Sequence, residues 1–200
     1  MLKMELPIFP LNGAVLFPGT SLPLNIFEDR YLKMVDYSLA RDRLIGMIQS
    51  DKNKNLYNIG CIGKIHSFSE TDDGRYLISL QGTTCFKVVE ELKAKYSFRL
   101  VNAGVLNYDE SRIYFTDDQK NNLIEKYKNF IKIKGLNFNL EEIEKIEFSQ
   151  IIKFFAMISP FNNIDKQALL ETKDMSEFYD KLLSIIELEI VGNFSNNTIN

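Results

Sequence analysis

Residues 7–35 read PIFPLNGAVLFPGTSLPLNIFEDRYLKMV, and this stretch decides how the N-terminal half folds. Its four prolines, at positions 7, 10, 18 and 23, predict short strands with irregular joints, because a proline cannot donate a hydrogen bond to a neighbouring strand. Asn25 and Glu28 have the spacing of a capping box, and apolar residues follow at helical intervals as far as Leu39. The stretch therefore predicts broken strands that lead into one helix.

Strand patterns continue after this helix to about residue 106. Apolar and polar residues alternate over residues 75–81, and Asp73-Gly74 just before them is a strong hairpin signal. We expect a second turn at residues 81–83, where a glycine interrupts the pattern. The first half of the chain, from Leu2 to about Leu106, is therefore expected to fold mostly as strands.

A slip in the apolar pattern marks the last predicted strand, which covers residues 96–106. The slip lies between Leu100 and Val101 and predicts a β-bulge at that point, because one extra residue moves the pattern to the opposite face of the sheet. Such bulges accompany strongly curved or barrel-like sheets. We therefore expect the sheet to be curved.

After Tyr108 the apolar residues repeat with a helical period. Pro160 is expected to end one helix, because the residue before a proline is pushed out of helical geometry, and the last helix is expected to end near Gly192. The sequence predicts a β subdomain over residues 1–110, a bundle of about four helices over 111–194 and a disordered tail over 195–200. Four pairs have N-capping spacing: Thr116 with Gln119, Asn139 with Glu142, Asn162 with Asp165, and Asp174 with Glu177.

The composition is that of an ordinary globular protein. Of the 200 residues 45% are hydrophobic, and the formal net charge of -3 gives no general attraction to nucleic acid or anionic lipid. The two cysteines, Cys61 and Cys85, are too few for a disulfide framework and predict reduced thiols in a cytosolic protein. The N-terminus has no apolar signal core, and no apolar stretch has the length of a membrane span. We expect a cytoplasmic protein.

Candidates for catalysis and metal binding are few. His66 is the single histidine, which excludes a zinc site built from histidines. The nearest approach to the nucleotide-binding pattern G-x-x-x-x-G-K-[ST] is GCIGK at residues 60–64, which lacks the spacing and the hydroxyl. The glutamates between positions 141 and 147 are expected to be a solvated helix start, favoured by the helix dipole. The sequence predicts no enzyme, no cofactor and no metal.

Several motifs carry a resemblance to a known family. Leu6–Leu11 (LPIFPL), Val15–Gly19 (VLFPG) and Pro23–Tyr31 (PLNIFEDRY) are similar to the opening of the Lon protease N-terminal, substrate-binding domain, which is related to peptidase family S16. Residues 73–86, DGRYLISLQGTTCF, resemble a later family segment in which arginine usually stands at the position of Cys85. The resemblance implies an α+β fold, with a PUA-like curved sheet or pseudo-barrel and one helix, followed by the helical bundle.

The resemblance also implies a function. In full-length Lon proteases this domain helps to recruit unfolded substrates, and neither the ATPase nor the protease module is recognisable in this chain. We therefore expect a free-standing, non-catalytic substrate-recognition or adaptor-like domain, whose partner is unfolded polypeptide or another protein, including a separate protease. RNA binding is the alternative implied by the PUA-like relationship. Its candidate surface is a helix with lysines at positions 120, 126, 128, 132 and 134.

Two segments hold the candidate polypeptide-binding residues. The motif FEDRY at residues 27–31 has two explanations. In the first, its arginine pairs with a carboxylate and fastens the helix to the sheet. In the second, Arg30 and Tyr31 border a peptide-binding groove. The segment FSQIIKFFAMISPF at residues 148–161 is apolar on two faces, so its helix is either central in the bundle or partly exposed to a partner. The candidates are Phe27, Arg30, Tyr31, Phe154, Met157 and Phe161.

Overall fold

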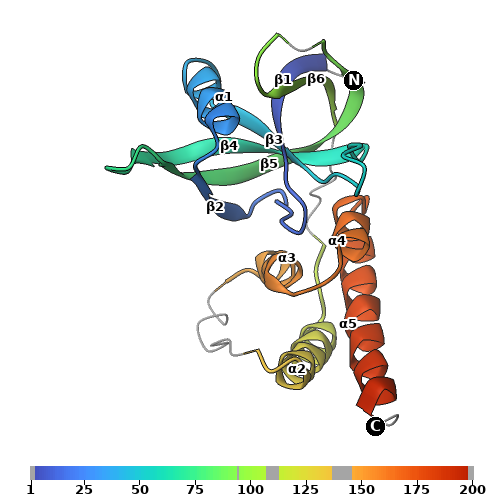
Figure 1. The fold of residues 1–200 in the computed structure, drawn as a ribbon. Helices are drawn as coiled ribbons and strands as arrows, with labels where there is room; N and C mark the ends of the chain where they lie inside the picture. The colour runs from blue at the N-terminus through green and yellow to red at the C-terminus, as the bar shows by residue number, and fades with distance from the viewer. Residues whose placement is uncertain (1–2, 94, 107–112, 137–145, 198–200) are drawn as a thin grey trace. The chain divides into compact units, whose positions relative to one another are not determined.

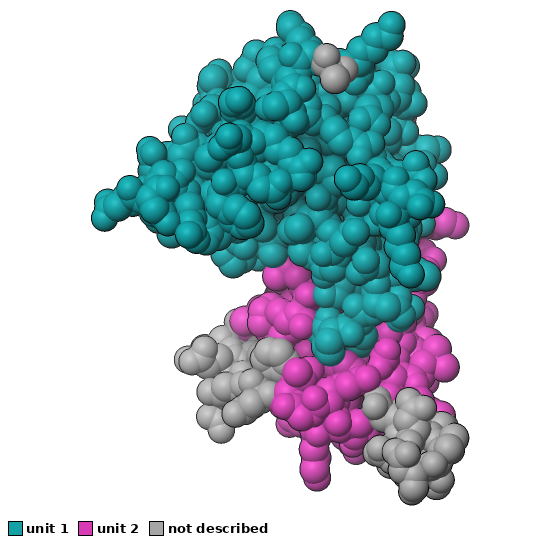
Figure 2. Space-filling model, viewed as in Figure 1, with its two compact units in different colours: residues 1–108, 159–171 teal, residues 109–158, 172–200 magenta. Residues whose placement is uncertain are grey.

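A computed structural model describes residues 3–93, 95–106, 113–136 and 146–197, with side chains as far as Gly192 (Figure 1). The described residues form six strands and five helices, which confirms the predicted α+β fold. They divide into two compact units. Unit 1 consists of residues 1–108 and 159–171, and unit 2 of residues 109–158 and 172–200 (Figure 2). Residues 159–171, which the sequence assigned to the helical part, thus group with the strands.

The strands of unit 1 form one curved sheet. Their order is β2-β5-β4-β3-β1-β6, and β5 also pairs with β6, so five of the six strands close into a barrel. β1 and β3 are parallel, and the other pairs are antiparallel. The bounds are β1 (Lys3–Pro10), β2 (Ser21–Ile26), β3 (Leu44–Ile48), β4 (Ile59–Glu70), β5 (Tyr76–Glu91) and β6 (Arg99–Val105). The predicted barrel-like sheet is confirmed.

β5 is one continuous strand of 16 residues, so the turn predicted at residues 81–83 is wrong. The segment before β2 crosses β5 at this point: the Gly82 N–H donates to the Thr20 carbonyl (2.8 Å), and the Gly19 N–H donates to the Gly82 carbonyl (2.9 Å). A Cβ atom on Gly82 would lie 2.2 Å from the carbonyl oxygen of Phe17. Gly82 is therefore the site of a close backbone crossing, which is the other common reason for glycine in a strand.

The bulge predicted within β6 is also wrong. β6 pairs with β1 without interruption, and the register shift lies on the neighbouring strand β5, between positions 88 and 90. Leu100 and Val101 are both buried because both faces of β6 are covered. Val101 belongs to the barrel core. Phe98 lies on the opposite face and contacts the ring of Tyr37, which belongs to helix α1 (Asp29–Leu39). Two consecutive residues of β6 are therefore buried on opposite faces of the strand, and no bulge is needed to explain their pattern.

Helix α1 (Asp29–Leu39) begins without the predicted capping box. Its N-cap is Glu28, whose side chain makes no capping hydrogen bond. The box fails because Asn25 is held in β2, where it pairs with Leu77. The apolar face of the helix instead fixes it on the sheet, through the buried side chains of Tyr31, Met34 and Val35.

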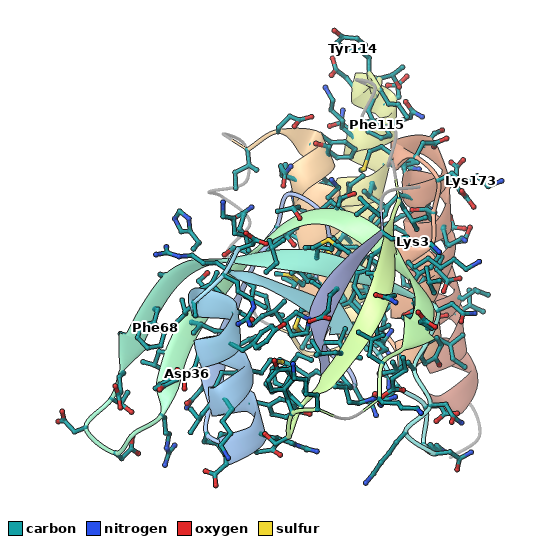
Figure 3. All side chains as sticks on the ribbon, turned by 90° about the horizontal axis from the view of Figure 1, so that it is seen from above. Lys3, Asp36, Phe68, Tyr114, Phe115 and Lys173 are labelled. Atoms are coloured by element: carbon teal, nitrogen blue, oxygen red, sulfur yellow. The ribbon has the colours of Figure 1, made fainter. Side chains whose placement is uncertain are left out.

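The predicted hairpin between β4 and β5 is confirmed. The Thr71 N–H donates to the Arg75 carbonyl (2.9 Å), and Gly74 has a φ of 78°, which suits glycine in a tight turn. Near the hairpin the rings of Tyr76 and Phe68 meet edge to face, with centroids 4.9 Å apart. Figure 3 labels Phe68 on this arm of the sheet.

Helix α4 (Asn163–Leu170) is tied to the barrel by buried polar side chains. Gln167 donates to the Ile59 carbonyl (3.0 Å), and Gln49 of the segment after β3 donates to the Asn163 carbonyl (3.0 Å) and to Gln167 Oε1 (3.1 Å). Lys166 Nζ donates to the Gly13 carbonyl (3.1 Å), and burial lowers the pKa of Lys166. These bonds explain why a helix from the last third of the chain belongs to unit 1.

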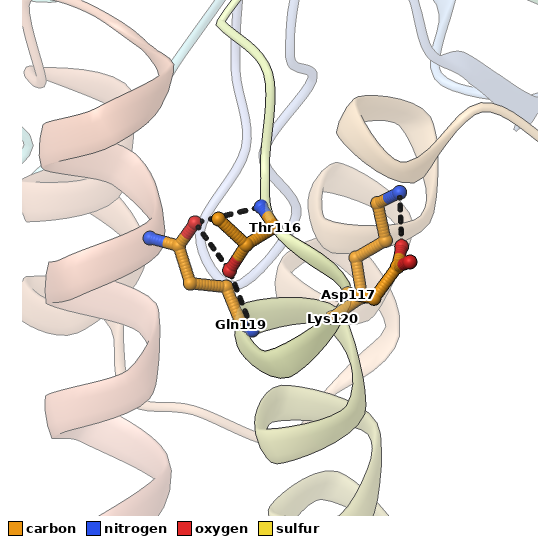
Figure 4. Close-up of polar contacts among 4 residues, drawn as sticks. All are labelled: Thr116, Asp117, Gln119 and Lys120. Atoms are coloured by element: carbon orange, nitrogen blue, oxygen red, sulfur yellow. Dashed lines mark hydrogen bonds and ion pairs between the residues drawn. The ribbon is translucent and has the colours of Figure 1, made fainter.

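Unit 2 contains α2 (Asp117–Ile133), α3 (Phe148–Ile158) and α5 (Met175–Asn197). The predicted capping box of α2 is confirmed: Thr116 accepts from the Gln119 N–H, Gln119 accepts from the Thr116 N–H, and Lys120 pairs with Asp117 beside them (Figure 4). α3 ends before Pro160 as expected. α5 extends beyond the predicted end near residue 192. The predicted cap at residues 139–142 lies outside the described residues.

The core of unit 2 is aromatic. The Tyr127 ring of α2 stacks on the Phe155 ring of α3, with centroids 3.6 Å apart and planes 8° from parallel. Both side chains are fully buried, as is Phe130 on the next turn of α2. α5 contacts both of the other helices. The apolar face of α2, formed by Leu123, Tyr127, Phe130 and Ile131, is therefore the face that packs in the unit.

Cys61 of β4 and Cys85 of β5 are buried and lie directly opposite each other. The Cys85 carbonyl accepts from the Leu106 N–H (2.9 Å), so the backbone polar groups of Cys85 face away from β4. The two cysteines thus form a pair without mutual backbone hydrogen bonds, the arrangement in which Cα atoms are about 4.5 Å apart. That separation is within the range that a disulfide spans.

We expect the azo compound diamide to join Cys61 to Cys85. Each thiol loses its hydrogen, a sulfur–sulfur bond forms, and diamide takes up both hydrogens as the hydrazine. The reaction should be slow, because both sulfurs are buried and the sheet must open locally to admit the oxidant. Peptide mapping without reductant detects the cross-link, and Cys85→Ser is the control that cannot form it. Two thiols still open to alkylation after oxidation and unfolding would contradict this expectation.

Candidate functional site

A cavity of about 410 Å³ opens in unit 1 where four elements meet. These are the end of β1, the start of α1, the loop between β3 and β4, and the start of β6. Its lining holds four cationic side chains and a single carboxylate, although the whole chain is acidic. The lining residues are Pro10, Asn12, Arg30, Tyr31, Ser50, Asp51, Lys52, Lys54, Ser97, Phe98 and Arg99.

The inner wall of the cavity is aromatic. Tyr31 and Phe98 are 8% and 5% exposed, so each shows only a small part of its ring to the cavity. Tyr31 is fixed from behind by the Phe9 ring, with centroids 4.2 Å apart. Burial raises the pKa of the Tyr31 hydroxyl, an effect opposed by the nearby Arg30 and Arg99 guanidinium groups. The wall therefore combines rigid apolar surface with one neutral phenol.

Two arginines stand at the rim of the cavity. Arg30 lies over the Tyr31 ring, 4.6 Å from its centroid, and forms an ion pair with Glu28 (2.7 Å). Arg99 donates to both carboxylate oxygens of Glu91 (2.6 Å each), which lowers the pKa of Glu91 and raises that of Arg99. Each guanidinium is thus held in place by a carboxylate, with further N–H groups left for other acceptors.

The loop between β3 and β4 supplies two lysines to the same rim. Asp51 folds this loop: its carboxylate accepts from the backbone N–H groups of Asn53 and Asn55 (2.8 Å each) and from the Asn55 side chain (2.9 Å). Lys54 has a φ of 66°, and its carbonyl accepts from Arg99 (3.2 Å). The loop is therefore fixed by its own hydrogen bonds and by β6.

Comparison with known proteins decides the family. The sequence profile of the ATP-dependent protease La (LON) substrate-binding domain matches residues 5–187. The chain belongs to this family. Its curated relatives include the Lon protease of Dictyoglomus thermophilum, 25% identical over 93% of the chain, and that of Brevibacillus choshinensis, 22% identical over 94%. The LON substrate-binding domain described here spans about a quarter of the length of these two relatives.

Solved structures support the same fold. A Lon N-terminal domain protein from Xanthomonas campestris has a TM-score of 0.67 at 20% identity, covering 90% of this chain and 98% of its own. The N-terminal domain of Lon protease from the Mycobacterium avium complex has a TM-score of 0.60 at 17% identity, covering 92% and 98%. At these identities the likeness concerns the fold, and it confirms the architecture that the motifs implied.

Three of the candidate residues lie in unit 1 of this LON substrate-binding domain, around the start of α1. Arg30 and Tyr31 both line the cavity, whereas Phe27 is 65% exposed outside its lining. The sequence reasoning missed Phe98 and Arg99, because only the pairing of β6 with β1 brings them to this place. No local sequence pattern around these two residues predicts that they line a cavity with Arg30 and Tyr31.

The remaining candidates do not form one surface stripe in the LON substrate-binding domain. Phe154 is 44% exposed on α3 of unit 2, and Met157 on the same helix is partly buried. Phe161 is 5% exposed and belongs to unit 1. A binding role for these three residues stays a prediction. Of the three, Phe154 has the exposed side chain that such a role requires.

Three of the five lysines of the helix considered for RNA binding have an acidic partner. Lys126 pairs with Glu187 (2.7 Å), Lys134 with Glu189 (2.6 Å), and Lys120 with Asp117 (3.2 Å). These ion pairs lie within unit 2 and reduce the positive charge that α2 offers to a phosphate backbone.

The described residues of the LON substrate-binding domain contain neither a group of metal ligands nor a membrane span. Within that part of the chain, no three side chains of histidine, cysteine, aspartate or glutamate group as metal ligands would. No helix among these residues has the length and apolar character of a membrane span.

Proposed function

We propose that this LON substrate-binding domain recognises polypeptide without catalysing a reaction on it, and that the cavity of Arg30 and Tyr31 is a contact site. One observation carries the proposal: two residues of the family-like FEDRY motif open together onto one cavity with an aromatic wall. Rigid aromatic surface beside arginine is the composition typical of protein-binding hot spots. The volume of about 410 Å³ accommodates a few side chains of a bound segment.

The cavity suits binding more than chemistry. Its titratable side chains are one tyrosine, two arginines, two lysines and one aspartate, and the aspartate is occupied by its own loop. The lining contains no histidine or cysteine, and its serines lie without a base beside them among the lining residues. Polar donors around an apolar wall fix the orientation of a ligand. These features support recognition of a segment that presents both apolar and acceptor groups.

Arg30→Ala tests the proposal. The ligand is a fluorescently labelled test protein that reduction and carboxamidomethylation keep unfolded. We expect the variant to bind it about three- to tenfold more weakly, because the cavity loses a cation and its hydrogen-bond donors. Arg75→Ala is the matched control, since Arg75 also forms an exposed ion pair, with Asp73, but lies on the hairpin arm. Fluorescence anisotropy measures the affinity. Equal affinities for both variants and the unchanged protein would exclude this cavity, and no binding by any of them would exclude the function.

A further inference from the structure

The four cations of the cavity are not equivalent. Arg30 and Arg99 are each paired with a glutamate that lies beside the cavity, Glu28 and Glu91. Lys52 and Lys54 are exposed, and no carboxylate of the described residues lies within ion-pair distance of either. The rim therefore keeps two positive charges that form no ion pair with a carboxylate among the described residues.

The one carboxylate in the lining does not neutralise them either. Asp51 accepts three hydrogen bonds within its own loop, and these bonds, chiefly those from Asn55, hold its pKa below the ordinary value. Its oxygens thus face the loop backbone and the Asn55 amide. A bound anion would consequently meet the lysines without displacing an existing ion pair.

The backbone of the loop that carries the two lysines is fixed before a ligand binds. Lys54 adopts a positive φ, which is uncommon outside glycine, and its carbonyl is held by Arg99, itself clamped to Glu91. The loop therefore holds the backbone of both lysines at the cavity, whose lining they share with Tyr31 and Phe98. Preorganised donors bind a ligand at a smaller cost in conformational entropy.

We propose that the cavity binds a carboxylate carried on an apolar or aromatic group. The carboxylate lies between Lys52 and Lys54 and accepts from the unused N–H groups of the arginines, while the apolar part packs on Tyr31 and Phe98. This proposal rests on the proposed function, because the carboxylate would come from a polypeptide. It is either the C-terminal carboxylate or an acidic side chain next to an apolar residue. A small aromatic acid has the same chemistry.

Labelled peptides of one sequence distinguish these sources. One peptide ends in phenylalanine with a free carboxylate, a second ends in its amide, and a third carries an internal Phe-Glu pair with an amidated end. N-acetylphenylalanine is the small-molecule probe, added as a competitor and observed by NMR. We expect the carboxylate peptides to bind about tenfold more tightly than the amide, and the difference to shrink as ionic strength rises.

The variant Lys52→Gln/Lys54→Gln should remove that difference. Both side chains are exposed, so the fold should be kept, and a thermal melt checks it. Lys64→Gln/Lys87→Gln is the matched control, because it removes the same charge from exposed positions of the same unit that do not line the cavity. The control should bind like the unchanged protein.

The outcomes separate the two proposals. If the peptides bind equally well with and without a carboxylate, or if the Lys52/Lys54 variant binds like the control, the carboxylate site is excluded while polypeptide binding stands. If only N-acetylphenylalanine binds, and binding requires Lys52 and Lys54, the carboxylate site stands and polypeptide binding is excluded. Preference for the carboxylate peptides that is lost in the variant alone supports both.

Discussion

Gly82→Ala is expected to lower the free energy of unfolding by about 3 kcal/mol or more. The added methyl carbon would stand 2.2 Å from the Phe17 carbonyl oxygen and 2.9 Å from its carbon, and these are backbone atoms that no rotamer change can move. Separating the two chain segments would stretch the hydrogen bonds that join Gly82 to Thr20 and Gly19. The loss therefore combines a steric clash with two weakened backbone bonds.

Urea denaturation followed by circular dichroism measures this effect. The matched control is Gly192→Ala on α5, because that residue is exposed and, apart from its chain neighbours and its own helix backbone, no atom of the described residues lies within 4 Å of a Cβ built on it. In a helix, alanine is favoured over glycine by up to about 1 kcal/mol, so the control should be neutral or slightly more stable. A Gly82→Ala protein with the stability of the control would show that the segment at Phe17 does not press on β5.

Phe155→Ala is expected to lower the free energy of unfolding by about 3–5 kcal/mol. Phe155 is fully buried in unit 2 and stacks on Tyr127 at 3.6 Å, so the change leaves a cavity and removes an aromatic contact. Tyr127 would also keep its phenol in a partly empty core. The substitution therefore acts on both helices that contribute to the stack.

Phe154→Ala is the neighbouring control on the same helix. Phe154 is 44% exposed, so its truncation should change stability by only about 0.5–1 kcal/mol. Thermal and urea unfolding compare the two variants. Phe154→Ala also belongs in the polypeptide-binding assay, because reduced affinity without loss of stability would support the role predicted for this residue. Equal losses of stability for both variants would contradict the packing described for α3.

The structural features that were predicted correctly from the sequence are mostly those formed by residues close together in the chain. The capping box of Thr116 and Gln119 and the hairpin turn at Gly74 were both found, because three or four residues suffice to form each of them. The capping box at Asn25 was wrong because pairing with Leu77 of β5 holds that residue in a strand. Local signals therefore failed where a distant strand competed for the same residue.

The same distinction applies to the cavity. Arg30 and Tyr31 were identified because they are adjacent in a specific motif at the start of α1. Lys52, Lys54 and Arg99 were missed, since a loop and a strand start bring them there from elsewhere in the chain. Gly82 was mistaken for a turn residue for a related reason: the backbone that requires a glycine belongs to a segment before β2. Such contacts leave no periodic trace in the sequence.

The attachment of α4 to the barrel has a consequence for folding during translation. The carbonyl of Ile59 accepts from Gln167, which is synthesised 108 residues later, and the carbonyl of Gly13 accepts from Lys166, 153 residues later. As the ribosome makes the chain from the N-terminus, the strands can pair early, but the carbonyls of Gly13 and Ile59 lack these donors until α4 (Asn163–Leu170) has emerged. A nascent chain stalled before that point should be far more sensitive to protease than one stalled after it.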